Sequence, residues 1–117
     1  LVSLLQDARR DVSAEVAQQM IARFATARGL PLEQFQASYA VLGAQRALRI
    51  LGIFARLCVQ AGKPGYLRLM PRVWGQLQDN LAHPALAGLK QVCDATLPAP
   101  TPDVLQKIED QCASPSP

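Results

Sequence analysis

Apolar residues recur at intervals of three and four along most of this chain, as they do on the buried face of an α-helix. Ser13 is a good N-cap for a helix that runs to about Arg28, and Gly29 is placed to end it. No stretch shows the alternation rich in Val, Ile or Thr that is typical of a strand. The pattern therefore predicts an all-α fold of about six helices.

The longest predicted helix runs from about Leu32 to Gln60 and is apolar around most of its circumference, so it should be central and buried. At 100° per residue, one narrow polar stripe falls within about 60° and consists of Ser38, Gln45, Arg49, Gly52 and Arg56. Arg46 lies off this stripe, at the edge of the apolar arc. The stripe is either a solvated face whose arginines extend to water, or a row of donors that binds hydroxyl, carboxylate or phosphate oxygens at a pocket floor.

Shorter helices are expected on either side of the long one. A short apolar helix should cover 1–8, and a further helix should cover 65–82, kinked or split at Pro71. The His83-Pro84 turn should lead into a helix over 85–96. We place the helical domain at 1–98, and assign 99–117 to a Pro-rich linker, a weak helix near 103–111 and a disordered tail.

Composition narrows the classes of function. The net charge of +3 comes from nine arginines and three lysines without a run of like charge, so we expect no nucleic-acid partner. No apolar run is long enough to span a bilayer, and no signal peptide is visible. Cys58, Cys93 and Cys112 are widely spaced beside a single histidine, so we expect no metal site and no disulfide. Three reduced thiols in a cytoplasmic protein are predicted, with Cys58 in the core.

The sequence contains no complete set of catalytic residues. No Gly-rich phosphate loop and no G-x-S-x-G motif is present, and His83 before a proline is expected to cap a turn. Asp7 and Asp11 are one helical turn apart with Arg9 between them, which favours a surface ion-pair network over paired catalytic carboxylates. The chain opens on the apolar string LVSLL without a preceding N-cap, so we expect a fragment of a longer protein.

Several strings resemble a known family. LVSLLQDARRDV (1–12) resembles the segment that follows the metal-binding aspartate motif in bacterial kinases of the aminoglycoside-phosphotransferase superfamily. YAVLGAQRALRILGIF (39–54), MPRVW (70–74) and LAHPAL (81–86) are similar to the C-terminal lobe of its N-acetylmuramate/N-acetylglucosamine 1-kinase branch. The resemblance covers about residues 1–98. It implies the helical C-lobe portion of a protein-kinase-like fold.

The resemblance also implies a function. Kinases of this branch use ATP and magnesium to phosphorylate the anomeric hydroxyl of an amino sugar in cell-wall recycling. No catalytic or metal-binding residue is expected in this segment, whose partners would be the sugar acceptor and the missing N-terminal lobe and catalytic loop. Candidate acceptor-binding residues are Gln45, Arg46 and Arg49, followed by Asp7 and Arg9. The alternatives are a stand-alone helical interaction module with an apolar face at 1–5, and a small helical nucleic-acid binder.

Overall fold

The computed structural model describes residues 1–9 and 11–112, and within them every regular element is a helix. The tail expected to be disordered, 113–117, lies outside the described residues. The all-α prediction is confirmed. The described residues form six α-helices and two 3₁₀ helices: α1 (Val2–Leu5), α2 (Ala14–Arg28), α3 (Leu32–Val59), η1 (Pro64–Leu69), α4 (Met70–Leu81), η2 (Pro84–Leu86), α5 (Ala87–Thr96) and α6 (Pro102–Asp110).

Local chemistry explains where the helices begin and end. The Ser13 hydroxyl accepts the Val16 amide at 3.2 Å and caps α2, as predicted. Gly29 ends α2 with a φ of 64°, a left-handed conformation that favours glycine. His83 also has its predicted capping role, because its Nδ1 accepts the Ala85 amide at 3.1 Å at the start of η2.

Pro71 splits the segment that was expected to be helical over 65–82. The first part is the 3₁₀ helix η1, and α4 begins at Met70, so Pro71 occupies the first turn of α4. A proline is tolerated there because the first-turn amides have no partner within the helix. The split therefore costs α4 no internal hydrogen bond.

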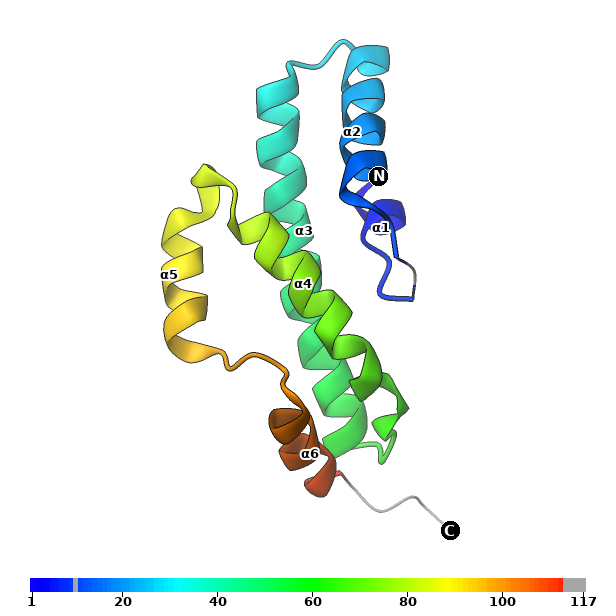
Figure 1. The fold of residues 1–117 in the computed structure, drawn as a ribbon, viewed down its shortest axis with the longest axis vertical. Helices are drawn as coiled ribbons and strands as arrows, with labels where there is room; N and C mark the ends of the chain where they lie inside the picture. Colours follow the sequence, from blue (N-terminus) through cyan, green and yellow to red (C-terminus); the bar gives the residue numbers. More distant parts are fainter. Residues whose placement is uncertain (10, 113–117) are drawn as a thin grey trace.

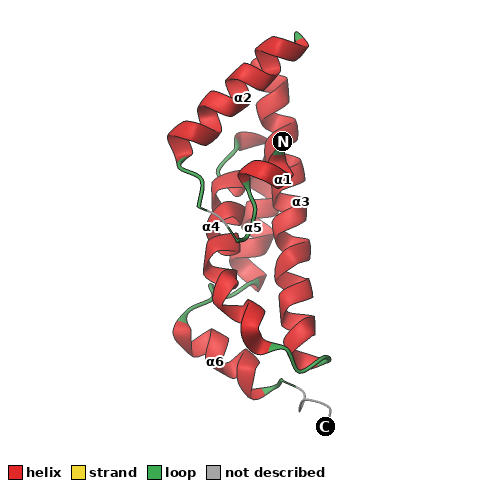
Figure 2. Ribbon diagram, turned by 90° about the vertical axis from the view of Figure 1, so that its right-hand side faces the viewer, coloured by secondary structure: helices red, strands yellow, loops and turns green. Residues whose placement is uncertain are grey.

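Helix α3 is the central element, as predicted. It contacts α1, α2, α4, α6 and both 3₁₀ helices, and α5 lies beside α4 (Figures 1 and 2). Its core face is built from small side chains, against which α4 packs larger ones. The buried cluster includes Ala40, Ala44 and Ala47 from α3 together with Val73, Leu77 and Leu81 from α4. Small residues on one helix let the other approach closely, so α3 and α4 form the spine of the molecule.

The buried face of α3 covers less of the helix circumference than its apolar pattern predicted. Gln45 and Arg49 of the predicted polar stripe are exposed, and so are the neighbouring Val41 (47%) and Leu42 (51%). The apolar pattern correctly identified the central helix but overestimated how much of its circumference is covered in this structure.

The prediction of three reduced thiols is wrong. Cys58, near the end of α3, forms a disulfide with Cys112, which directly follows α6, and only Cys93 is a free, buried thiol. Cys58 is completely buried, as expected. Helix α6 contacts α3 and η1, and brings together two cysteines that lie 54 residues apart in the chain. Sequence spacing does not reveal such a pairing, because the pairing depends on how the last helix folds back.

Candidate functional site

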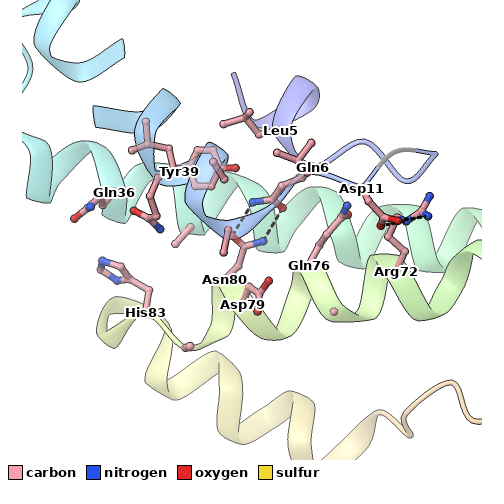
Figure 3. A pocket seen from close by; sticks show the side chains of 18 residues that line it. Leu5, Gln6, Asp11, Gln36, Tyr39, Arg72, Gln76, Asp79, Asn80 and His83 are labelled. Carbon is pink, nitrogen blue, oxygen red and sulfur yellow. Dashed lines mark hydrogen bonds and ion pairs between the residues drawn. The ribbon is translucent and has the colours of Figure 1, made fainter. Parts of the chain in front are cut away.

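An open cavity of about 790 Å³ lies between α2 and α4, with α3 as its floor and the segment after α1 along one side (Figure 3). Amide side chains dominate its polar lining. Its polar, charged and aromatic lining side chains are Gln6, Asp11, Gln18, Gln36, Tyr39, Arg72, Gln76, Asp79, Asn80 and His83.

Asn80 of α4 and Gln6 form a reciprocal amide pair at one side of the cavity. The Asn80 Nδ2 donates to Gln6 Oε1 at 2.8 Å, and the Gln6 Nε2 donates to Asn80 Oδ1 at 3.0 Å. Asn80 is only 4% exposed, so these bonds satisfy a polar group that would otherwise be costly to bury. The pair fits because Gly43 of α3 has no side chain. A Cβ there would lie 2.5 Å from the Asn80 Nδ2.

Two more α4 side chains hold the same side of the cavity. Gln76 donates its Nε2 to the Asp7 carbonyl oxygen at 3.3 Å. Arg72 donates to the Ala8 carbonyl oxygen at 3.0 Å and forms an ion pair with Asp11, with 2.8 Å between Nε and Oδ1. These contacts join α4 to residues more than sixty positions earlier in the chain.

The floor of the cavity carries a neutral phenol. Burial raises the pKa of the Tyr39 hydroxyl above its ordinary value, and a hydrogen bond with Gln6 opposes part of that shift. Tyr39 therefore stays protonated at neutral pH and can both donate and accept. Together with the nearby amides of Gln18 and Gln36, it gives a lining suited to neutral hydroxyl or amide groups of a ligand.

The acidic side chains do not form a metal site. Asp11 is paired with Arg72, and Asp79 is a single carboxylate on the cavity wall. Across residues 1–9 and 11–112, no three His, Cys, Asp or Glu side chains gather closely enough to share a metal ion. Magnesium needs several oxygen ligands, so the described residues do not fit the ion that the family resemblance implies.

The α3 candidates do not line this cavity. Gln45 and Arg49 are exposed on another face of α3, where Arg49 borders a separate shallow depression. Arg46 is half-buried, and its Nε is a buried nitrogen without a hydrogen-bond partner among the described residues. Their predicted role in acceptor binding therefore remains a prediction, and the structure gives it no cavity of this size.

Asp7 and Arg9 lie together directly after α1. The Arg9 Nη2 is 3.3 Å from Asp7 Oδ2, and the Asp7 Oδ1 accepts the Arg9 backbone amide at 2.8 Å. This contact raises the pKa of the Arg9 guanidinium above its ordinary value. The expected surface ion pairing is present between Asp7 and Arg9, whereas Asp11 pairs with Arg72 of α4.

Sequence reasoning missed the residues that organise the cavity, namely Gln6, Gln76 and Asn80. Arg72 was not among the predicted site residues either. One signal was available, because Arg72, Gln76 and Asn80 are spaced four residues apart on a predicted helix and so share one face. What that face contacts was not predictable from the spacing.

The comparisons with known proteins agree with the resemblance. The chain is 46% identical over 102 residues to the N-acetylmuramate/N-acetylglucosamine kinase of Caulobacter vibrioides, a match covering 86% of this chain and 28% of that protein. It is 42% identical over 79 residues to the Pseudomonas aeruginosa kinase of the same name, covering 63% of this chain and 23% of the relative. The chain is also 36% identical over 85 residues to the kinase of the same name from Neisseria meningitidis, a match covering 67% of this chain and 25% of that protein.

No protein-family model matches the chain. The chain spans about a quarter of the length of the curated relatives it matches. None of the helices in its described part is long and apolar enough to cross a membrane. The resemblance stated from the sequence is thus confirmed: this chain is similar to one segment of the N-acetylmuramate/N-acetylglucosamine kinases.

Proposed function

We propose that this chain is the acceptor-side part of an ATP-dependent phosphotransferase that acts on an N-acetylated amino sugar. The observation that carries the proposal is the 46% identity over 102 residues to a kinase of that name. The fold of the complete protein would be kinase-like, with this chain in its helical C-terminal lobe. Its place would be the cytoplasm, in cell-wall sugar recycling.

The cavity between α2 and α4 is the best candidate for the acceptor side. Hydroxyl and acetamido groups need both donors and acceptors, which amide side chains and a neutral phenol supply without placing a net charge beside the ligand. ATP and magnesium would be held by parts of the complete protein outside this chain. The chain alone is therefore proposed to be non-catalytic, and no step of phosphoryl transfer is assigned to its residues.

The disulfide changes one argument for location. Reduced thiols were the sequence-based reason for expecting the cytoplasm, and the Cys58–Cys112 pair removes that reason. The cytoplasmic part of the proposal now rests on the resemblance alone.

The direct test is phosphorylation of N-acetylmuramate and N-acetylglucosamine by the complete protein, measured as ATP-dependent formation of the sugar phosphate. Gln36→Ala in the cavity and Gln45→Ala with Arg46→Ala on α3 then compare the two candidate acceptor surfaces. A loss of kcat/KM for the sugar in Gln36→Ala alone assigns the acceptor to the cavity. A loss in the α3 variants alone assigns it to the exposed α3 face. A complete protein that phosphorylates neither sugar would show that the proposal is wrong.

A second candidate function, a helical interaction module, is favoured by the apolar residues at the start of the chain. Leu4 is 63% exposed and Leu1 is 36% exposed, so α1 presents an uncovered apolar surface. Leu4→Asp separates the two functions. It should abolish binding of a protein partner if the chain is an interaction module. It should leave sugar phosphorylation by the complete protein unchanged if the chain is part of a kinase, because Leu4 does not line the cavity.

A further inference from the structure

Helix α4 presents three polar side chains in a row toward one segment of the chain. The row consists of Arg72, Gln76 and Asn80, and we call it the α4 ladder. Its target is the docked segment, defined as residues 6–9 and 11. From the ladder, Arg72 reaches the Ala8 carbonyl and the Asp11 carboxylate, Gln76 reaches the Asp7 carbonyl, and Asn80 pairs with Gln6. Figure 3 shows the contacts with the Asp11 and Gln6 side chains.

Two of these contacts are made to backbone carbonyl oxygens, at Asp7 and Ala8. A side chain that binds a backbone carbonyl fixes the path of the chain, whatever side chain that residue carries. The ladder therefore determines where the docked segment runs across α4.

Besides the ladder, the docked segment is positioned by two small patches of apolar burial and by no regular structure of its own. The helix before it, α1, has only four residues, and a helix of one turn is unstable without tertiary contacts. The segment itself has no regular secondary structure. Its placement relative to α4 depends on the ladder, on Leu5, which is 7% exposed, and on Ala8, which is 9% exposed and belongs to the buried cluster that includes Val73 and Leu77 of α4.

The docked segment is also a wall of the candidate acceptor cavity. Gln6 and Asp11 line the cavity together with all three ladder residues. The described side-chain hydrogen bonds of the ladder all go to the docked segment, so we take the ladder's contribution to a ligand to be the shape of the wall.

We propose that the α4 ladder is a set of positioning residues for the acceptor cavity: it holds the docked segment at the distance from α4 that the acceptor requires. This inference rests on the proposed function, since it takes the cavity to be the acceptor side of an amino-sugar kinase. The ladder residues act through the docked segment and are not catalytic residues.

The test compares Gln76→Leu with Gln78→Leu in the complete protein. Gln78 lies on the same helix outside the cavity lining, and its Nε2 is buried without a hydrogen-bond partner among the described residues. Replacing Gln78 by Leu therefore removes no described side-chain hydrogen bond, whereas Gln76→Leu removes the hydrogen bond to the Asp7 carbonyl oxygen. Arg72→Lys is a second, milder ladder variant, because it retains the charge and loses the guanidinium fork.

Two readouts are measured for each variant. Backbone amide hydrogen exchange should accelerate about fivefold in Gln76→Leu at Gln6 and Arg9, whose amides donate hydrogen bonds within the structure, since one neutral hydrogen bond is lost from a local structure. The KM for the amino sugar should rise by a similar factor, about fivefold, while the KM for ATP stays unchanged. Gln78→Leu should change neither quantity.

The outcomes distinguish the inference from the proposed function. Faster exchange in the ladder variants with an unchanged sugar KM would overturn the positioning role and leave a purely structural one. An equal rise of both KM values, or the same rise in Gln78→Leu, would also overturn it. If the wild type phosphorylates no amino sugar, the proposed function fails and the positioning role fails with it. The exchange data then still show whether the ladder holds the segment.

Discussion

The two ends of the described chain both fold back onto the α3–α4 spine, but different chemistry holds each of them. The N-terminal docked segment buries the small side chain of Ala8, is held mainly by amide and guanidinium hydrogen bonds from α4, and lines the cavity. The C-terminal helix α6 lies beside the end of α3 (Figure 1). Its Leu105 and Ile108 pack against a buried cluster of Cys58, Leu67 and Met70, and the Cys58–Cys112 disulfide links this end of the chain to α3. None of its residues lines the cavity.

The attachment of α6 is therefore rigid, whereas the attachment of the docked segment can shift its position. Apolar burial combined with a covalent bond fixes α6 firmly and needs no particular geometry from a ligand. Hydrogen bonds to carbonyl oxygens are directional and individually weak, about 1 kcal/mol each, so they set a position that a small change can shift. The end that lines the cavity is the one held by the weaker, directional contacts.

The largest expected effect tests the covalent attachment. Cys112→Ser opens a loop closed over a sequence separation of 54, and should lower the free energy of unfolding by about 4 kcal/mol. Urea unfolding under non-reducing conditions measures it, and the wild type in a dithiol reductant should reproduce the loss. Equal stability of the wild type with and without reductant would show that the disulfide does not hold α6.

The next effect tests the amide pair of the docked segment. Gly43→Ala places a methyl group 2.5 Å from the Asn80 Nδ2, so the pair with Gln6 must separate, at a cost of about 1–3 kcal/mol. Gly52→Ala on the same helix is the matched control. A Cβ there meets nothing within 4 Å, and the better helix former should stabilise the chain by about 0.5–1 kcal/mol. Opposite signs in thermal unfolding are expected, and a stabilising Gly43→Ala would contradict the close contact.

A smaller effect tests the charged contact of the ladder. Asp11 is 84% exposed at its side chain, so Asp11→Asn should cost less than about 1 kcal/mol, and the cost should vanish at high salt. Asp94→Asn, which removes the exposed i,i+4 pair with Lys90, provides the comparison on α5. Only Asp11→Asn should accelerate amide exchange in the docked segment. Equal exchange in both variants would show that the ion pair does not contribute to docking.

The smallest effect concerns the face of α3 that neither end covers. Gln45→Ala and Arg49→Ala should change the free energy of unfolding by less than about 0.5 kcal/mol, because both side chains are exposed. Chemical denaturation of each variant measures this. A loss above 1 kcal/mol would mean that this face makes contacts that the described structure does not contain.

Much of the fold was predictable because its determinants are local. The N-cap at Ser13, the left-handed Gly29 and the first-turn Pro71 depend on the conformational preferences of single residues, and each sits at a helix boundary. The central position of α3 followed from its apolar periodicity. The resemblance to amino-sugar kinases followed from strings that the comparisons with relatives confirm.

The candidate site was not predictable in the same way. The polar stripe of α3 looked functional because it interrupted an apolar helix, yet Gln45 and Arg49 are exposed and line no part of the main cavity. The residues that do converge there come from positions such as Gln6 and Asn80, which are 74 apart in the chain.

The sequence by itself determined the all-α class, the approximate positions of the helices and the kinase resemblance, because periodicity, capping and sequence similarity are all carried by residues close together in the chain. Only the tertiary structure decided that Gln6 meets Asn80 beside Gly43, and that Cys58 meets Cys112. The physical reason is the same in both cases. Hydrogen bonds and disulfides act over a few ångströms, and whether two distant residues come that close depends on how whole helices pack.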